Sequence, residues 1–171
     1  MLDANKNQIF EFIGKELKYQ TKDYTSRYVD NSSEDYLINT NFLDKNDIEK
    51  LVINYFSLSK FQDNLILDLI TTSDDFEKSY ERFKIDFKND DFTILDIRIK
   101  RETIEKKAIN QNKRYLEIKV RREELIDVLT NRKPWEDLSI GFQCRIYRNP
   151  NIYNSDFWYH FTNIYISKAI V

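Results

Sequence analysis

The sequence predicts an α+β domain, with an antiparallel sheet of about five strands covered by helices and an N-terminal helical extension. Three observations predict this class. The spacing of apolar residues changes from about 3.6 to about 2 after residue 64, which indicates helices followed by strands. The chain has 171 residues, enough to bury a core without disulfide or metal support. Its 41% hydrophobic and 15% aromatic residues are typical of a folded chain.

The first predicted element is an amphipathic helix over residues 5–19. Its apolar face comprises Ile9, Phe12, Ile13 and Leu17. Residues 20–36 are mostly polar and are predicted to be a loop or linker. We therefore expect two parts, an N-terminal helix and polar linker at 1–43 and an α+β domain at 44–171.

The second part opens with a predicted helix over 45–58, for which Asp44 is the expected N-cap. Four strands follow, each recognised by apolar residues at every second position. They lie near 64–71, 83–87, 95–99 and 116–120. Because such alternation is typical of antiparallel strands with one solvated face, we expect these four strands to form a meander.

Helices and one more strand complete the predicted domain. A helix lies near 122–131, and a shorter one lies over 135–140. A fifth strand follows over 142–146, and a last helix starts at Asn154 or Ser155, residues suited to capping. The predicted buried core comprises Leu67, Phe83, Phe87, Ile97, Leu116, Ile118, Leu125, Leu129, Phe142 and Ile146.

Composition excludes several classes of protein. Lys and Arg total 27 and Asp and Glu total 29, a net charge of -2, which argues against a general nucleic-acid binder. The chain has one Cys, so an internal disulfide cannot form and a reducing cytoplasm is the expected location. No apolar run approaches the ~20 residues that span a bilayer, and the N-terminus has no signal-peptide pattern, so no membrane span is expected.

Composition also argues against metal and phosphate-loop chemistry. His160 is the only His and Cys144 the only Cys, so a multi-histidine or cysteine-based metal centre cannot be built within this chain. The two glycines, Gly14 and Gly141, fit no glycine-rich phosphate loop. We therefore expect no metal and no cofactor, and we assign no catalytic residue.

Two features leave alternatives open. His160 could act as a general acid or base, since the intrinsic pKa of histidine lies near neutrality, or it could be a structural residue in an aromatic helix. The aromatic residues could line a cavity for a small apolar ligand or lipid, or they could form an ordinary core.

The order of elements from Tyr115 to Tyr153 resembles a known family. This stretch is expected to form a strand, a Leu-rich helix, a second short helix and a final strand. It is similar to the end of a sterol-carrier-protein-type domain, and the preceding meander agrees with that family. The resemblance implies a curved antiparallel sheet covered by helices, with room for apolar ligands between the layers.

A narrower resemblance lies in the residues Trp135-Glu136-Asp137-Leu138-Ser139-Ile140-Gly141, Arg145, Arg148, Asn149-Pro150-Asn151 and Tyr153-Asn154. They are similar to the C-terminal tail of the larger, sometimes Rieske-linked, metallo-β-lactamase-fold proteins related to sialic-acid hydroxylases. The metal ligands of that family lie in a His- and Asp-rich motif that this sequence lacks, so no catalytic residue is carried over. The resemblance implies that this chain is the accessory, C-terminal part.

Three hypotheses of function follow. The first is a non-catalytic accessory or interaction domain that docks on a metallo-β-lactamase-fold metalloenzyme or on another copy of itself. The second is a free-standing binder of a small apolar ligand. The third is an enzyme that uses His160 with neighbouring carboxylates.

The residues expected to contact a ligand or partner are Trp135, Arg145, Arg148, Asn151, Tyr153 and His160. From strand parity, Arg145 should point away from the face that carries Cys144 and Ile146. Trp135 should bury its ring and find an acceptor for its N–H. Arg148 should tie the bend at Asn149-Pro150 to neighbouring carbonyls or a carboxylate.

Overall fold

The computed structural model describes residues 8–13, 16–21 and 44–163. The chain divides into two compact units, Met1–Asn39 and Thr40–Val171. The first unit contains strands β1 (Gln8–Ile13) and β2 (Glu16–Thr21), which pair antiparallel with Gln8 opposite Thr21.

The predicted helix over 5–19, and with it the helical extension, is wrong wherever the structure describes this stretch. Its apolar residues fit a helical period, but Gln8–Ile13 also combines two isoleucines with two phenylalanines, which favour strands. Gly14 stands between the two strands in the sequence, and glycine is typical of tight hairpin connections. The predicted polar loop lies almost entirely outside the described residues.

The second unit contains a five-stranded sheet with the order β5-β4-β3-β6-β7. Its strands are β3 (Leu65–Thr72), β4 (Ser79–Asp86), β5 (Asp91–Ile94), β6 (Arg114–Arg121) and β7 (Cys144–Asn149). All neighbours are antiparallel except β3 and β6, which run parallel. The predicted α+β class with five strands is confirmed, whereas the four-strand meander is wrong.

The meander fails because an unpredicted helix, α3 (Arg101–Asn110), separates β5 from β6. Parallel strands need a crossover connection, usually a helix, and α3 supplies it. Only Ile104 and Ala108 of this helix are buried, one turn apart. Two buried residues give too weak an apolar stripe for the helix to be recognised in the sequence.

The strand predicted at 95–99 is also wrong, because β5 already ends at Ile94. Asp96 Oδ1 accepts a hydrogen bond from the backbone N–H of Arg98 at 2.9 Å, and the N–H of Ile99 donates to the Asp96 carbonyl at 3.1 Å. Such local bonds of an aspartate compete with strand pairing. Ile97 is consequently 45% exposed rather than part of the core.

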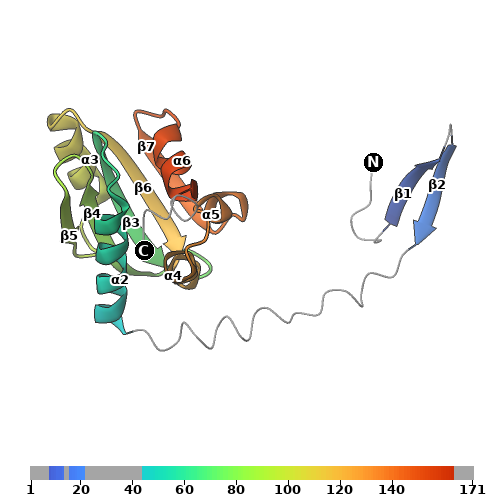
Figure 1. Ribbon diagram of the computed structural model, residues 1–171, viewed down its shortest axis with the longest axis horizontal. Coiled ribbons are helices and arrows are strands. Elements are labelled where there is room, and N and C mark those ends of the chain that lie inside the picture. The colour runs from blue at the N-terminus through green and yellow to red at the C-terminus, as the bar shows by residue number, and fades with distance from the viewer. Residues whose placement is uncertain (1–7, 14–15, 22–43, 164–171) are drawn as a thin grey trace. The chain divides into compact units, whose positions relative to one another are not determined.

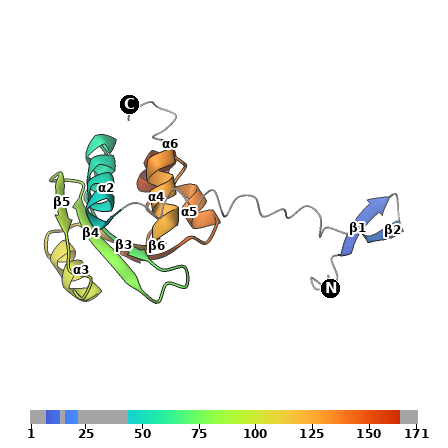
Figure 2. The same ribbon diagram turned by 90° about the horizontal axis from the view of Figure 1, so that it is seen from below.

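Helices cover both faces of the sheet (Figures 1 and 2). One face carries α2 (Lys45–Ser59), α4 (Arg122–Asn131), α5 (Glu136–Ile140) and α6 (Ser155–Asn163), and α3 lies on the other. Apolar residues alternate between the faces, so that Leu67 of β3 faces the larger core and its neighbour Ile66 faces α3. The helices predicted for α2, α4, α5 and α6 are confirmed.

Most of the predicted core is buried. This holds for Leu67, Phe83, Phe87, Leu116, Ile118, Leu125 and Leu129, while Ile146 is half-buried against the same cluster. Phe142 was placed in the core wrongly and is 84% exposed. It lies in the turn that ends α5, where its N–H donates to the Ser139 carbonyl, and β7 begins only two residues later.

The N-terminus of α2 is fixed as predicted. Asp44 has extended backbone angles, and its Oδ1 accepts a hydrogen bond from the backbone N–H of Asp47 at 2.9 Å. The cap satisfies one of the N–H groups that a helix start leaves without a partner. It sets the point at which α2 crosses the sheet, next to the pocket described below.

Candidate functional site

Trp135 anchors the connection between α4 and α5 from inside the core. Its side chain is fully buried, and its Nε1 donates to the Tyr55 hydroxyl at 3.0 Å, so the predicted burial with a paired N–H is confirmed. The ring packs edge-on against Phe56 and Phe157, with centroids 5.6 and 5.5 Å away. Burial raises the pKa of Tyr55 above its ordinary value, which keeps its hydroxyl protonated.

His160 lies half-buried on α6, in contact with two aromatic rings. Its Nε2 is 3.0 Å from the Ser59 carbonyl oxygen, which can only accept, so this nitrogen carries the proton. Phe61 and Phe161 lie 4.9 and 5.0 Å from the imidazole centroid. Burial lowers the pKa of His160, and the bond to Ser59 opposes this shift only partly, so the ring is neutral near pH 7.

The odd-numbered residues of β7 face α3. Tyr147 Oη and Asn149 Nδ2 both donate to Glu105 Oε1 of α3, at 2.9 and 2.6 Å. Cys144 and Ile146 pack instead against the larger core. The parity predicted for Arg145 is therefore confirmed, and its guanidinium lies 4.5 Å from the ring centroid of Phe76, in the loop between β3 and β4.

Arg148 differs from its expected arrangement. Its guanidinium lies over the ring of Tyr153 at 5.4 Å, and its Nε is buried without a hydrogen-bond partner in the described part of the chain. The expected bonds to carbonyls or a carboxylate are thus not made among residues 44–163. Asn151 and Tyr153 are both exposed just beyond β7, so four of the six predicted contact residues gather along this strand and the bend after it.

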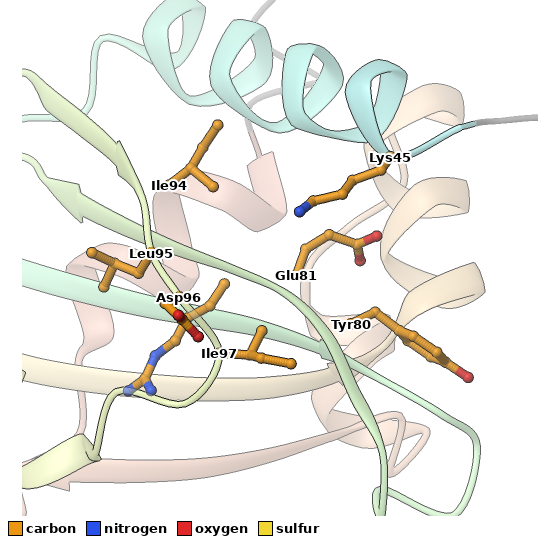
Figure 3. Close-up of a pocket in the computed structure, with 8 residues that line it drawn as sticks. Lys45, Tyr80, Glu81, Ile94, Leu95, Asp96 and Ile97 are labelled. Atoms are coloured by element: carbon orange, nitrogen blue, oxygen red, sulfur yellow. The ribbon is translucent and has the colours of Figure 1, made fainter.

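A separate pocket of about 430 Å³ lies where β5 ends and β4 continues (Figure 3). Lys45, from the start of α2, lies on one side with Glu81, while Ile94 and Leu95 lie opposite. Glu81 already accepts a hydrogen bond from Thr71 Oγ1, and Arg122 Nε lies 3.3 Å from its carboxylate. The pocket therefore offers mixed polar and apolar walls, with its central carboxylate already engaged.

A buried polar network under α3 was missed by the sequence reasoning. Asp68 has no exposed surface and receives bonds from Arg82 Nε at 2.8 Å, Arg82 Nη2 at 2.6 Å and Tyr115 Oη at 2.5 Å. Burial alone would lower the pKa of Arg82, but the bonds and charge of Asp68 outweigh it and raise the pKa. The sequence does contain an indication of this buried network, because the charged residue Asp68 interrupts the apolar run Leu65–Ile70.

Cys144 is the remaining group with potential chemistry. Burial raises the pKa of its thiol to about 11, so at neutral pH it is protonated and a weak nucleophile. Within residues 8–13, 16–21 and 44–163, no group of three or more His, Cys, Asp or Glu side chains is arranged to hold a metal ion. None of the helices in this described part has the length and apolar character needed to cross a membrane.

The geometry defines an α+β domain in which most charged side chains pair with one another or with the backbone. Its exposed aromatic and arginine side chains gather at β7.

The chain is similar to curated proteins named cytidine monophosphate-N-acetylneuraminic acid hydroxylase. It is 34% identical over 111 residues to the one from Sus scrofa and 36% identical over the same length to the one from Xenopus laevis. The Homo sapiens protein, named as an inactive hydroxylase, is 33% identical over 111 residues.

The similarity covers 63% of this chain but only a fraction of each relative. The matched stretch is 22% of the Sus scrofa protein, 17% of the Xenopus laevis protein and 20% of the Homo sapiens protein. The chain thus spans about a fifth of the length of the curated relatives it matches. No protein-family model matches the chain, and no solved structure matches it.

Proposed function

We propose that this chain is a non-catalytic accessory domain that associates with a metalloenzyme of the sialic-acid-hydroxylase type. One observation carries the proposal: 111 residues match hydroxylases at 33–36% identity, yet they amount to about a fifth of those enzymes. The resemblance of Trp135–Tyr153 to the tail of metallo-β-lactamase-fold proteins supports that class of partner. On this proposal the reaction centre belongs to the partner, and this chain supplies a folded surface.

The state of His160 favours this proposal over an enzyme built on that residue. A general acid or base needs a nitrogen that can reach substrate and a pKa near the working pH. The Nε2 proton of His160 is committed to the Ser59 carbonyl, and its pKa is lowered. No carboxylate within the described ranges forms a hydrogen bond or ion pair with the ring.

The packing of the larger core favours the proposal over a free-standing binder of apolar ligands. A sterol-carrier-like site would need space between the sheet and the helices. Aromatic rings occupy that layer, because the ring of Phe87, directly after β4, lies 5.9 Å by centroids from Phe56 of α2 and 5.9 Å from Phe161 of α6. These separations are typical of direct ring packing.

Exchanging segments between proteins tests the proposed function. The 111-residue segment of the Sus scrofa hydroxylase would be replaced by the matching segment of this chain, and hydroxylation of CMP-N-acetylneuraminic acid would be measured. We expect the exchanged enzyme to retain activity, the enzyme with the segment deleted to lose it, and this chain alone to show none. Because the replaced segment is a surface domain on this account, the exchange should leave the reaction centre intact.

Two results would overturn the proposal. Turnover by the isolated chain would make it an enzyme in its own right. An exchanged enzyme that folds, as shown by circular dichroism and a cooperative melt, but is as inactive as the deletion would show that the segments are not equivalent. Restoring the original Sus scrofa segment in the same expression system is the control.

A further inference from the structure

We propose that the free edge of β7, together with the apolar side chains at its two ends, is the docking surface of this domain. The occupant we infer is an extended segment with acidic side chains, contributed by the metalloenzyme and added to the sheet as a further strand. This inference rests on the proposed function and names the surface and the chemistry through which the association occurs.

The backbone of β7 is available for such pairing. Among the described strands, β7 pairs only with β6, and it lies at one margin of the sheet (Figure 1). The N–H of Arg121 donates to the Gln143 carbonyl at 3.1 Å. Because hydrogen-bonded residues alternate along an antiparallel strand, the odd-numbered residues of β7 are the ones whose backbone bonds to β6. The N–H and C=O groups of Cys144, Ile146 and Arg148 therefore point away from the sheet, as strand addition requires.

Large apolar side chains gather at both ends of this strand. The exposed ones are Ile140 at 72%, Phe142 at 84%, Ile152 at 63% and Tyr153 at 58%, with Tyr147 between them on the strand itself. They are half of the ten large hydrophobic residues that are exposed in the described part of the chain. Single exposed apolar residues are ordinary, but their concentration along one strand marks an interaction site.

Phe142 supplies a second, independent observation. Its φ of 56° lies in the left-handed region, which is unusual for a bulky residue. The conformation is held by bonds from the N–H of Phe142 to Ser139 and from the N–H of Gln143 to Leu138, at 3.3 and 2.9 Å. The turn that ends α5 thus holds the aromatic ring of Phe142 in solvent at the start of β7, where a partner strand can contact it.

Charge identifies the occupant. From Phe142 to Tyr153 the chain contains Arg145 and Arg148 but no Asp or Glu. Neither arginine forms an ion pair within residues 44–163, and the Nε of Arg148 is a buried donor without a partner. An acidic strand would neutralise both guanidinium groups.

A second copy of this chain is a poorer occupant for the same reason. Antiparallel pairing of two β7 edges would bring four arginines together with no carboxylate from either strand. Like charges across a strand pair are destabilising. The opposite margin of the sheet, β5, is shorter at four residues and has one strongly exposed apolar side chain, Ile94.

Surface variants of the full chain test the inference. The double variant Phe142→Asp with Ile152→Asp removes an exposed apolar side chain at each end of β7 and adds charges that repel an acidic partner. Ile109→Asp is the matched control, because Ile109 is an exposed apolar residue on α3. All three side chains are exposed, and Asp tolerates the left-handed backbone at position 142, so the melting midpoint of the free chain should fall no further in the double variant than in the control.

Binding would be measured by calorimetry against the Sus scrofa hydroxylase lacking its 111-residue segment. We expect the control to bind as the unmodified chain does and the double variant to bind at least about tenfold more weakly, the loss expected for an interfacial aromatic anchor. In the exchanged enzyme, the double variant should lower the melting midpoint and the control should not.

The outcomes separate the inference from the proposed function. Binding of the unmodified chain that the double variant leaves unchanged would overturn the docking surface but leave the accessory role standing. Failure of the chain to bind, where the Sus scrofa segment itself binds, would overturn both. A concentration-dependent dimer of the free chain that the double variant dissociates would make a second copy the occupant and contradict the inference.

Discussion

Glu117 is the residue whose ionisation is most at odds with its surroundings. It is buried on β6 next to Asp68, its register partner on β3. Burial and the charge of Asp68 raise its pKa, and the nearby cations Lys119, Arg101 and Arg82 offset this only partly. The ionised form is thus less favourable in the folded protein than in the unfolded chain.

This arrangement predicts that Glu117→Gln stabilises the protein in a pH-dependent way. Because the folded-state pKa of Glu117 is raised, its contribution to stability is complete below the unfolded pKa, near about 4.3, and is lost as the pH rises through the folded pKa. The variant should therefore match the unmodified protein at about pH 4 and have the higher melting midpoint at about pH 8. Thermal melts across this range would measure the difference.

Glu102→Gln is the control for this prediction, because Glu102 is an exposed carboxylate on α3. It should not raise the melting midpoint at the higher pH as Glu117→Gln does. A Glu117→Gln variant that is less stable than the unmodified protein at the higher pH would contradict the prediction, because it would show that the carboxylate is stabilising when charged.

At the scale of elements, α4 illustrates how burial decides stability. Leu125 is fully buried, and Val128 and Leu129 of the same helix are nearly so. Leu125→Ala leaves a cavity that the sheet and α2 cannot readily fill. The substitution should therefore lower the free energy of unfolding by about 2–5 kcal/mol. Urea denaturation monitored by circular dichroism would measure the loss.

An exposed position on the same segment provides the comparison for Leu125. Thr130→Ala, on α4 itself, should cost much less because Thr130 is exposed. A loss for Leu125→Ala well under ~1 kcal/mol, which is below the usual range for a packed leucine, would mean that α4 does not cover the sheet in solution.

Elements with strong periodicity could be predicted from the sequence, and weakly patterned ones could not. The stripe Ile48, Val52 and Tyr55 indicates α2, and the alternation around Leu67 and Leu116 indicates β3 and β6. Helix α3 buries only two residues, so its pattern is close to that of a polar loop. The β1–β2 hairpin was missed because its apolar spacing fits a helical period, and the signal for a strand is only the isoleucine and phenylalanine content of Gln8–Ile13.

The candidate site was predictable in part for a related reason. Strand parity placed Arg145 correctly, since alternation along a strand is a local property. Arg148 could not be placed in this way, because its contact with the ring of Tyr153 depends on how the chain bends after β7. Asp68 and Arg82 meet across a strand pair, so their network required the sheet register to be known.

In the second unit as a whole, the two faces of the sheet have different roles. The larger core under α2, α4, α5 and α6 holds the fold together through packed aromatic rings. The α3 face neutralises buried charges internally through Asp68 and Arg82. The edge of β7 carries Arg145 and Arg148, which form no ion pair within residues 44–163, and the proposed docking surface lies there.

Amide hydrogen exchange at β7 tests this claim most directly. In the free chain the N–H of Ile146 points outward and should exchange quickly, while that of Tyr147, bonded to β6, should exchange slowly. Adding the Sus scrofa hydroxylase that lacks its matched segment should slow exchange at Ile146 while leaving Ile94 of β5 unchanged. Complex formation without protection of Ile146, or with protection of the β5 edge instead, would contradict the proposed docking surface.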